Sequence, residues 1–206
     1  MGDEKIVCDS KENFSYTSLK VKKPTLKYVN KFLELDCKID LMKYDIFPNA
    51  KEITETYAVY HAIRSNRNKF SISWNWDDNN TFISIGDGST PRTAAFFAFM
   101  TNWDCHSVDP QLNIEEKYDN IKRLHLYDKK IQEVNFDTDV AILSFVHSHV
   151  DVDESLKSIN ADEYFIVAMP CCQELSIDDR EPDMVYSDWG CFSPKRKVKI
   201  WNLKDY

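Results

Sequence analysis

The sequence predicts an α/β protein with a mostly parallel sheet, and three observations lead to this class. Residues 140–146 are apolar except for Ser144 and residues 164–169 are continuously apolar, as is typical of strands buried on both faces of a parallel sheet. Strand-like and helical segments alternate along the chain, which indicates βαβ units. Residues 184–186 and 198–201 are two neighbouring strand-like segments near the end of the sequence. We expect them to add an antiparallel hairpin at one edge of the sheet.

The first long helix is expected over residues 50–66. Asn49 precedes it and is a good N-cap residue, because its side-chain oxygen can accept a backbone N–H. The apolar side chains that recur at helical spacing in this stretch are Ile53, Tyr57, Val59, Tyr60 and Ile63. The residues before this helix are mixed in composition. We therefore expect an N-terminal extension at 1–45 that packs on a single globular unit at 46–206.

From residue 81 the elements become regular. A strand at 82–85 runs through a turn that contains glycine into a helix at 91–101, which we expect to be amphipathic. The further expected elements, besides the two apolar strands, are strands at 105–108 and 121–126 and a short helix at 151–159. Helices in such an order cover both faces of the sheet. The predicted architecture is therefore a Rossmann-like three-layer αβα arrangement.

Composition narrows the class of protein. The chain has 206 residues, 43% of them hydrophobic, which suffices for one domain with a substantial core. Its formal net charge of −8 argues against indiscriminate nucleic-acid binding, because phosphate contacts need local positive charge. Six cysteines occur without an apolar leader segment, so we expect reduced thiols and a cytoplasmic location. No apolar run approaches the roughly 18 residues of a membrane span.

The turn after the first regular strand carries the strongest functional signal. Two of the four glycines in the chain, Gly86 and Gly88, flank Asp87 just before the next helix. Backbone N–H groups and the helix dipole at such a helix start favour ligand binding, and glycine permits close approach. Further on, Asp109 ends the next strand, where dinucleotide-type sites have an acid that hydrogen-bonds ribose hydroxyls. The alternatives are a purely structural tight turn at the glycines and an Asx turn of Asp109 before Pro110.

The third glycine of the dinucleotide pattern is absent after Gly86 and Gly88. This weakens a pyrophosphate cradle and favours a nucleoside ligand without phosphates, S-adenosylmethionine, over NAD. An NAD-type dehydrogenase remains a third possibility, although the chain leaves no room for a separate substrate domain. Arg92 lies close to the start of the helix, where the helix dipole disfavours a cation. We therefore expect an anionic partner for Arg92, either a substrate carboxylate or Asp87.

Two segments resemble a known family. Residues 84–90 (SIGDGST), with Asp109 downstream, resemble motifs I and II of class I S-adenosylmethionine-dependent methyltransferases. Residues 143–149 (LSFVHSH) and 167–172 (VAMPCC) are similar to a subgroup of methyltransferase-like proteins that includes some tRNA ribose methyltransferases. That subgroup has a histidine at the end of the fourth strand and a Cys-Cys pair after the fifth. The resemblance covers roughly residues 80–175.

The resemblance implies an S-adenosylmethionine site and methyl transfer. The residues it implies at the cofactor are Ser84, Gly86, Asp87, Gly88, Ser89, Asp109 and Ser144. The sequence departs from the family at Ser84, where an acidic residue that helps hold the methionine end of the cofactor is usual, and at Thr90. It also lacks the Asn-Pro-Pro-Tyr motif of base amino-group methylation and the Lys-Asp-Lys-Glu set of cap-type ribose methyltransferases.

Histidines and cysteines follow the two apolar strands, and the candidates are His147, His149, Cys171 and Cys172. His147 is the candidate general base, because imidazole titrates near neutral pH. Cys171 and Cys172 are candidates to shape the pocket or to act as a nucleophile. The four residues also form a possible zinc set, but adjacent cysteines rarely supply two ligands to one tetrahedral metal, so we expect no metal. The structural alternative is buried thiols and histidines that bond to backbone.

Lys195, Arg196 and Lys197 form a basic cluster that is the candidate contact to RNA phosphates. A protein partner with a basic face is the other candidate, because the chain as a whole is acidic. The expected function is methyl transfer from S-adenosylmethionine to an unidentified acceptor, with RNA favoured. The alternative is a catalytically inactive methyltransferase-fold protein that acts as a binding partner or scaffold in a complex.

Overall fold

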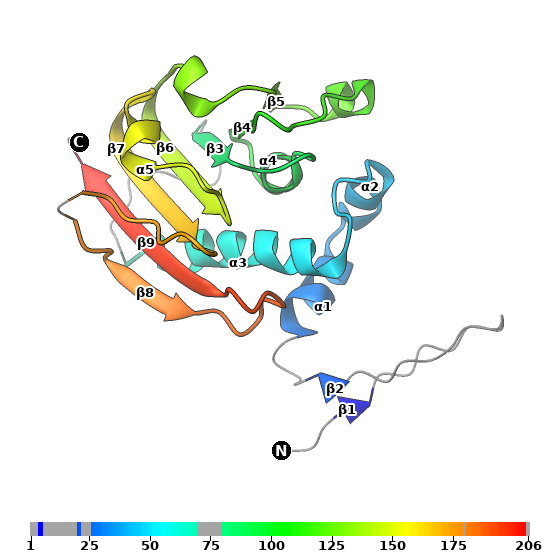
Figure 1. Ribbon diagram of the computed structural model, residues 1–206. Coiled ribbons are helices and arrows are strands. Elements are labelled where there is room, and N and C mark those ends of the chain that lie inside the picture. Colours follow the sequence, from blue (N-terminus) through cyan, green and yellow to red (C-terminus); the bar gives the residue numbers. More distant parts are fainter. Residues whose placement is uncertain (1–3, 6–19, 22–25, 70–79, 179, 205–206) are drawn as a thin grey trace.

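The computed structural model describes residues 4–5, 20–21, 26–69, 80–178 and 180–204. Its main feature is a seven-stranded sheet in the order β5-β4-β3-β6-β7-β9-β8 (Figure 1). The strands are β3 (Thr81–Ile85), β4 (Asp104–Val108), β5 (Leu124–Tyr127), β6 (Phe136–Val146), β7 (Ile159–Met169), β8 (Met184–Ser187) and β9 (Lys197–Lys204). A separate two-stranded sheet pairs β1 (Glu4–Lys5) with β2 (Lys20–Val21).

The strands from β3 to β7 are mutually parallel, and β9 is antiparallel to both of its neighbours, β7 and β8. β8 and β9 form a hairpin at one edge, drawn in orange and red in Figure 1. The predicted α/β class, the mostly parallel sheet and the antiparallel edge hairpin are therefore confirmed. β6 and β7 begin earlier than predicted, because their first residues alternate between buried and exposed instead of being continuously apolar.

The helices are α1 (Lys27–Glu34), α2 (Lys38–Lys43), α3 (Ala50–Asn66), α4 (Arg92–Met100) and α5 (Val152–Leu156), with 3-10 turns η2 (Glu116–Asn120) and η3 (Ile131–Glu133). α1, α3 and α4 pack on one face of the sheet and α5 and η3 on the other, which gives the predicted three layers. α3 has the predicted bounds, and Asn49 Oδ1 accepts the Glu52 N–H at its start (3.2 Å). None of the helices in the described part of the chain combines the length and apolar character that crossing a bilayer requires.

The expectation of an amphipathic helix at 91–101 is wrong. All residues of α4 from Thr93 to Ala98 are buried. The helix lies between the sheet and α3, so that Phe97 stacks on Phe82 of β3 while Phe96 packs edge-on against Tyr60 of α3. A helix covered on opposite sides needs apolar residues all round, and the sequence of α4 meets that need with alanines and phenylalanines.

α1 and α2 lie before the predicted boundary at residue 46 and contribute to the core. Tyr28, Phe32 and Leu41 are buried in the same hydrophobic cluster as α3 and α4. Tyr28 also donates a hydrogen bond to Asp188 Oδ2 (2.5 Å), in the turn between β8 and β9. Burial and this carboxylate raise the pKa of the Tyr28 hydroxyl. The division into extension and globular unit stays a prediction, and residues 1–3, 6–19 and 22–25 lie outside the described part.

The hydrogen bond between Tyr28 and Asp188 leads to a stability prediction. Tyr28→Phe removes the donor and leaves a buried carboxylate with one partner fewer. We expect the free energy of unfolding to fall by about 1.5–3 kcal/mol, measured by urea unfolding followed by circular dichroism. Tyr44→Phe is the control, because the Tyr44 hydroxyl has no hydrogen bond to any described residue, and it should change stability by less than about 0.5 kcal/mol. Equal losses in the two variants would contradict the prediction.

Candidate functional site

A cleft with a volume of about 580 Å³ opens at the carboxyl ends of β3, β4 and β6. Its lining includes Gly86, Gly88 and Arg92 after β3, Asp109 after β4, and His147 and His149 after β6. These ends meet because β3 pairs in parallel with both β4 and β6. β3 is the strand at which the order of the sheet reverses, and ligands of open α/β sheets bind at such a point. The volume lies within the roughly 300–1,000 Å³ of small-molecule sites.

The two glycines of the turn are required by its geometry. Gly86 and Gly88 have φ angles of +76° and +87°, in the left-handed region that favours glycine. A Cβ on Gly86 would lie 2.5 Å from Ser148 Oγ, and one on Gly88 would lie 3.0 Å from the Arg92 guanidinium. The structural and functional interpretations of the turn are thus compatible, because the same bare backbone forms the tight turn and lines the cleft.

Asp109 lies beside the glycine turn. Its Oδ2 accepts the Gly88 N–H (2.9 Å), and its Oδ1 accepts the Gln111 N–H (2.7 Å). The second contact is the Asx turn considered from the sequence, and the first joins the end of β4 to the turn after β3. Each carboxylate oxygen keeps a further lone pair, and the half-buried side chain lines the cleft. Asp109 can therefore still accept hydrogen bonds from a ligand's hydroxyl groups.

The Asp87 carboxylate is buried beneath the turn and does not line the cleft. It accepts hydrogen bonds from the backbone N–H groups of Thr93 and Ala94 (3.1 and 3.2 Å) and from the Ser107 hydroxyl (3.0 Å). The negative charge thus caps the N-terminus of α4, where the helix dipole stabilises it. Asp87 acts on the cleft indirectly, by holding the turn between α4 and β4.

Three further residues predicted at the cofactor site also lie outside the lining of the cleft. Ser84 and Ser144 are buried inside the sheet on neighbouring strands, and the Ser144 hydroxyl donates a hydrogen bond to Ser84 Oγ (3.1 Å). Ser89 is exposed, and its carbonyl accepts the Asn113 N–H (3.0 Å). The serine in place of the family's acidic residue at position 84 therefore completes a polar pair within the sheet.

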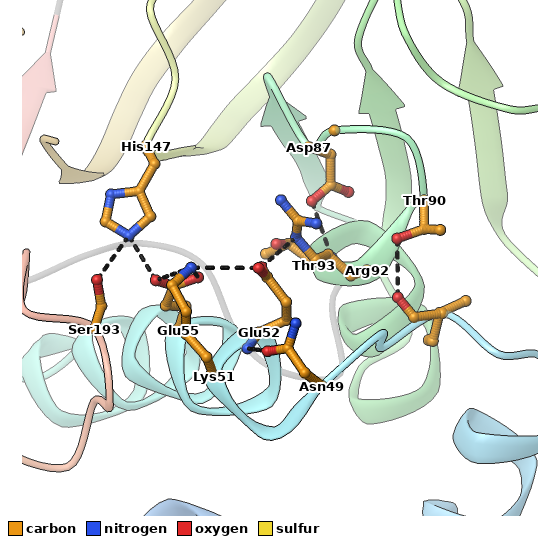
Figure 2. A network of polar contacts seen from close by, with 12 residues as sticks. Asn49, Lys51, Glu52, Glu55, Asp87, Thr90, Arg92, Thr93, His147 and Ser193 are labelled. Carbon is orange, nitrogen blue, oxygen red and sulfur yellow. Dashed lines mark hydrogen bonds and ion pairs between the residues drawn. The ribbon is translucent and has the colours of Figure 1, made fainter. Parts of the chain in front are cut away.

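Arg92 has the anionic partner that its position demands, and this partner is Glu52 of α3. The Arg92 Nε lies 3.1 Å from Glu52 Oε2, as Figure 2 shows. Asp87 does not pair with Arg92, because its carboxylate is taken up by the N-terminus of α4. A row of alternating charges continues along α3, since Lys51 Nζ lies 3.3 Å from Glu52 Oε1 and 2.8 Å from Glu55 Oε1.

His147 ends this row and is held by a carboxylate. Its Nε2 lies 2.6 Å from Glu55 Oε1 and 3.4 Å from Ser193 Oγ (Figure 2). Its Nδ1 is buried and has no hydrogen-bond partner among the described residues. The backbone is in the left-handed region, with φ +52°, just after β6. A histidine held by a carboxylate through one ring nitrogen keeps the other nitrogen for proton transfer.

Glu55 is the functional candidate that the sequence analysis missed. Its side chain is 2% exposed. Burial by itself raises the pKa of Glu55, but hydrogen bonds from His147 and Lys51 outweigh burial and lower the pKa below its usual value. One signal was present in the sequence, because Glu55 stands three residues before Ala58 and four before Val59. A carboxylate at those spacings lies on the buried stripe of the helix.

The two cysteines and His149 form a second cluster at the same sheet edge. His149 Nε2 lies 3.1 Å from Cys171 Sγ and 3.2 Å from Cys172 Sγ, and the two sulfurs are 3.5 Å apart. Val146 pairs with Met169, which brings the segments after β6 and β7 together as expected. Burial by itself raises the pKa of Cys171, but hydrogen bonds from Cys172 and His149 lower it to about 7. His149 lines the cleft, whereas Cys171 lines a smaller neighbouring hollow.

The predicted basic cluster borders that smaller hollow, which Lys195, Arg196 and Lys197 line together with Cys171. The positive charge is partly compensated, because Lys197 Nζ lies 3.1 Å from Glu174 Oε1. The Arg196 guanidinium stacks over the Trp189 ring, 4.7 Å from its centre, and Trp189 is 64% exposed. An exposed aromatic ring beside a guanidinium is a surface on which a base can stack.

No family model and no curated protein matches the sequence. Similar solved structures include a point mutant of MtNAS, with 11% identity and a TM-score of 0.46 over 88% of this chain and 70% of that chain. A complex of the same mutant with S-adenosylmethionine has 12% identity and a TM-score of 0.44, over 88% and 72% of the chains. Phosphoethanolamine N-methyltransferase 1 of Haemonchus contortus, bound to phosphoethanolamine and S-adenosylhomocysteine, has 14% identity and a TM-score of 0.39, over 73% and 34%.

With TM-scores below 0.5, these structures do not by themselves assign the fold of this chain. The chain's own sheet carries the assignment, because five parallel strands are followed by a C-terminal hairpin whose last strand runs antiparallel between its neighbours. This is the Rossmann-like arrangement with an antiparallel edge hairpin that the sequence predicted.

The lowered pKa of Glu55 predicts a pH dependence of stability. The folded state binds the proton less tightly than the unfolded state does, so the stabilisation is fully present above the ordinary glutamate pKa of about 4.3. It is lost as the pH falls from there toward the lowered pKa. We expect Glu55→Gln to be less stable than the wild type at pH 7 and to lose less stability down to pH 3, in urea unfolding at each pH.

Glu174→Gln is the control for this series. Hydrogen bonds from Lys199 and Lys197 also lower the pKa of Glu174, but its side chain is 59% exposed, so solvent and salt screen the effect. Its pH profile should follow that of the wild type. A Glu55→Gln profile parallel to the wild type would mean that the carboxylate and His147 are not paired in solution.

Proposed function

We propose that the chain binds S-adenosylmethionine in the cleft at the carboxyl ends of β3, β4 and β6 and catalyses methyl transfer. One observation carries the proposal, namely the hydrogen bond of 2.9 Å from the Gly88 N–H to Asp109 Oδ2. It puts a carboxylate at the end of the second strand directly beside the glycine turn after the first, within one cleft. A nucleoside ligand needs this combination. Its ribose hydroxyls donate hydrogen bonds to the carboxylate, and the rest of the ligand passes over the backbone of the glycine turn.

The residues present fit such a ligand. The cleft volume of about 580 Å³ suits a nucleoside with an amino-acid tail. A Cβ on Gly86 would come within 2.5 Å of Ser148 Oγ, so the turn stays open only with glycine. Arg92 lines the same cleft, and its guanidinium has further N–H donors besides the Nε that faces Glu52 to offer a carboxylate group of the ligand. With Ser84 turned into the sheet, this arginine is our candidate for holding the methionine end.

The bound cofactor supplies an electrophilic methyl group on a sulfonium, and the protein's task is mainly placement of the acceptor. His147 is the proposed general base. Glu55 fixes the imidazole through Nε2, which leaves the lone pair on Nδ1 to take the proton that the acceptor releases. The negative charge of Glu55 also stabilises the imidazolium that then forms. Glu55 is therefore a positioning residue.

We propose RNA as the acceptor class to test first. Trp189 and Arg196 offer a stacking surface, and Lys195 next to them is exposed. These residues lie by the hollow that contains Cys171, at the sheet edge where the cleft opens. The net charge of −8 restricts such binding to this local patch. In this proposal Cys171 and Cys172 line the approach of the acceptor.

A catalytically inactive binding protein is the second candidate, and one observation favours it. Ser84 replaces the acidic residue usual in the family, and its hydroxyl is bonded to Ser144 inside the sheet. The cleft therefore lacks a carboxylate contributed from that position. Without a carboxylate at position 84, the protein would bind the cofactor weakly or not at all. It would then contact a basic partner protein through its acidic surface.

The cofactor assignment is tested by isothermal titration calorimetry with S-adenosylmethionine and with NAD. We expect binding of S-adenosylmethionine alone. Asp109→Ala should weaken it at least tenfold, equivalent to about 1.4 kcal/mol, because the ribose hydroxyls lose their acceptor. Asp109→Asn, which keeps one carbonyl acceptor, should lie between the wild type and the alanine variant.

Asp104→Ala is the matched control, because Asp104 starts the same strand, β4, at the opposite end. Its affinity for S-adenosylmethionine should equal that of the wild type. Binding unaffected by Asp109→Ala would refute the assignment of this cleft. Binding of neither cofactor would favour the inactive binding protein.

The role of His147 is tested by transfer of a labelled methyl group from S-adenosylmethionine to total RNA and to total protein. His147→Asn suits the left-handed backbone at this position, because asparagine tolerates it better than most residues. We expect the transfer rate to fall by about 10²–10⁴-fold, while calorimetry shows cofactor affinity close to that of the wild type. Glu55→Gln should lower the rate less and should shift its pH profile.

His125→Asn is the control, since His125 is exposed on the edge strand β5 and does not line the cleft. Its transfer rate should not change. A His147→Asn variant that transfers methyl groups at the wild-type rate would exclude this residue as the base.

A further inference from the structure

A three-donor cluster at the cleft mouth has no part in the proton transfer assigned to His147. It consists of His149 Nε2, Cys171 Sγ and Cys172 Sγ, and these atoms all lie within 4.8 Å of one another. Within the described ranges it is the one group of three or more histidine, cysteine or acidic side chains so arranged. We propose that these three residues bind a thiophilic metal ion, with Zn²⁺ as the best match. This proposal does not depend on the proposed methyl transfer.

The donor types select the metal. Two thiolates and one imidazole are borderline-soft ligands, which favour Zn²⁺ over the oxygen-seeking Mg²⁺ and Ca²⁺. No carboxylate belongs to the cluster. The imidazole nitrogen faces both sulfurs at once, at 3.1 and 3.2 Å, which is the convergence that a shared ion requires.

The spacing of the donors is close to that of a tetrahedral site. With Zn–S bonds of about 2.3 Å and a Zn–N bond of about 2.05 Å, tetrahedral angles put two sulfurs about 3.8 Å apart and nitrogen and sulfur about 3.6 Å apart. The sulfurs here are 3.5 Å apart, and nitrogen and sulfur 3.1 and 3.2 Å. Shifts of a few tenths of an ångström therefore suffice to admit the ion. Cys172 and His149 are exposed, so their side chains are free to make these shifts.

The sequence argued against this site because adjacent cysteines rarely supply two ligands to one tetrahedral metal. Cys171 and Cys172 do not belong to a strand, since β7 ends at Met169 and the chain bends after Pro170. In the bend both sulfurs turn toward the same histidine. The bend thus allows two adjacent cysteines to face one ion.

Three protein donors leave the fourth position of a tetrahedral ion open. Structural zinc sites are closed by four protein ligands, whereas catalytic sites keep a position for water or substrate. His149 lines the large cleft and Cys171 lines the smaller hollow beside Lys195 and Arg196. The ion would therefore lie between the two, with a ligand position accessible to an incoming molecule.

The test is metal titration of the full chain, reduced and freed of metal with a chelator. Co²⁺ reports thiolate coordination through its charge-transfer absorption, and Zn²⁺ is then added against a chromophoric chelator. We expect one equivalent of either metal per chain. Cys171→Ser, Cys172→Ser and His149→Gln should each weaken Zn²⁺ binding on the order of 100-fold or more.

Cys37→Ser is the matched control, because Cys37 is a partly exposed free thiol beside α2 and away from the cluster. It should bind like the wild type. Circular dichroism and urea unfolding of each variant separate loss of the site from loss of the fold, and the exposed Cys172 and His149 make unfolding of those variants unexpected.

Three outcomes would overturn the proposal. The first is less than one equivalent of metal in the reduced wild type. The second is equal binding by the wild type and the cluster variants. The third is a reduced chain that takes up no metal but forms a disulfide between Cys171 and Cys172 on mild oxidation. Mass spectrometry would show this bond as the loss of two hydrogens. That result would assign the pair to redox chemistry.

Discussion

The buried carboxylate of Asp87 is the interaction on which the site depends. It joins three parts of the molecule, since it caps α4, accepts a hydrogen bond from Ser107 of β4 and belongs to the turn after β3. An uncompensated charge at this depth would cost several kcal/mol, so its three donors must remain in place. With the turn held in this way, the Gly88 N–H meets Asp109 at the next strand end. The cleft keeps its shape because these hydrogen bonds hold the turn, α4 and the end of β4 together.

α3 has two roles in the structure. Its apolar residues cover one face of the sheet, and its first turns place Glu52 and Glu55 beside Arg92 and His147, which line the cleft. The two carboxylates hold two groups of the lining, Arg92 and His147, with Lys51 between them. Because each charge in this row has an opposite neighbour, the wall stays ordered without leaving an isolated buried charge.

Much of the fold was open to prediction from the sequence, and the site only in part. Buried parallel strands are recognisable because both of their faces are apolar, and the helix at Ala50–Asn66 because its stripe and its cap are both local patterns. The turn at Gly86 and Gly88 was identified because so few residues tolerate its backbone. That the Asp87 carboxylate caps α4 was not predicted, because it depends on the geometry between the turn and the helix start.

From residue 50 on, the sequence by itself determined most of the elements, their order and the chemistry at each strand end, since these follow from local periodicity and turn residues. Only the tertiary structure decided which polar groups meet. Glu55 reaches His147 across a separation of 92 residues. Cys171 and Cys172 converge on His149 because the chain bends after β7. Such pairings depend on how a helix packs against a sheet edge, and that packing results from apolar burial over the whole core, which no local pattern encodes.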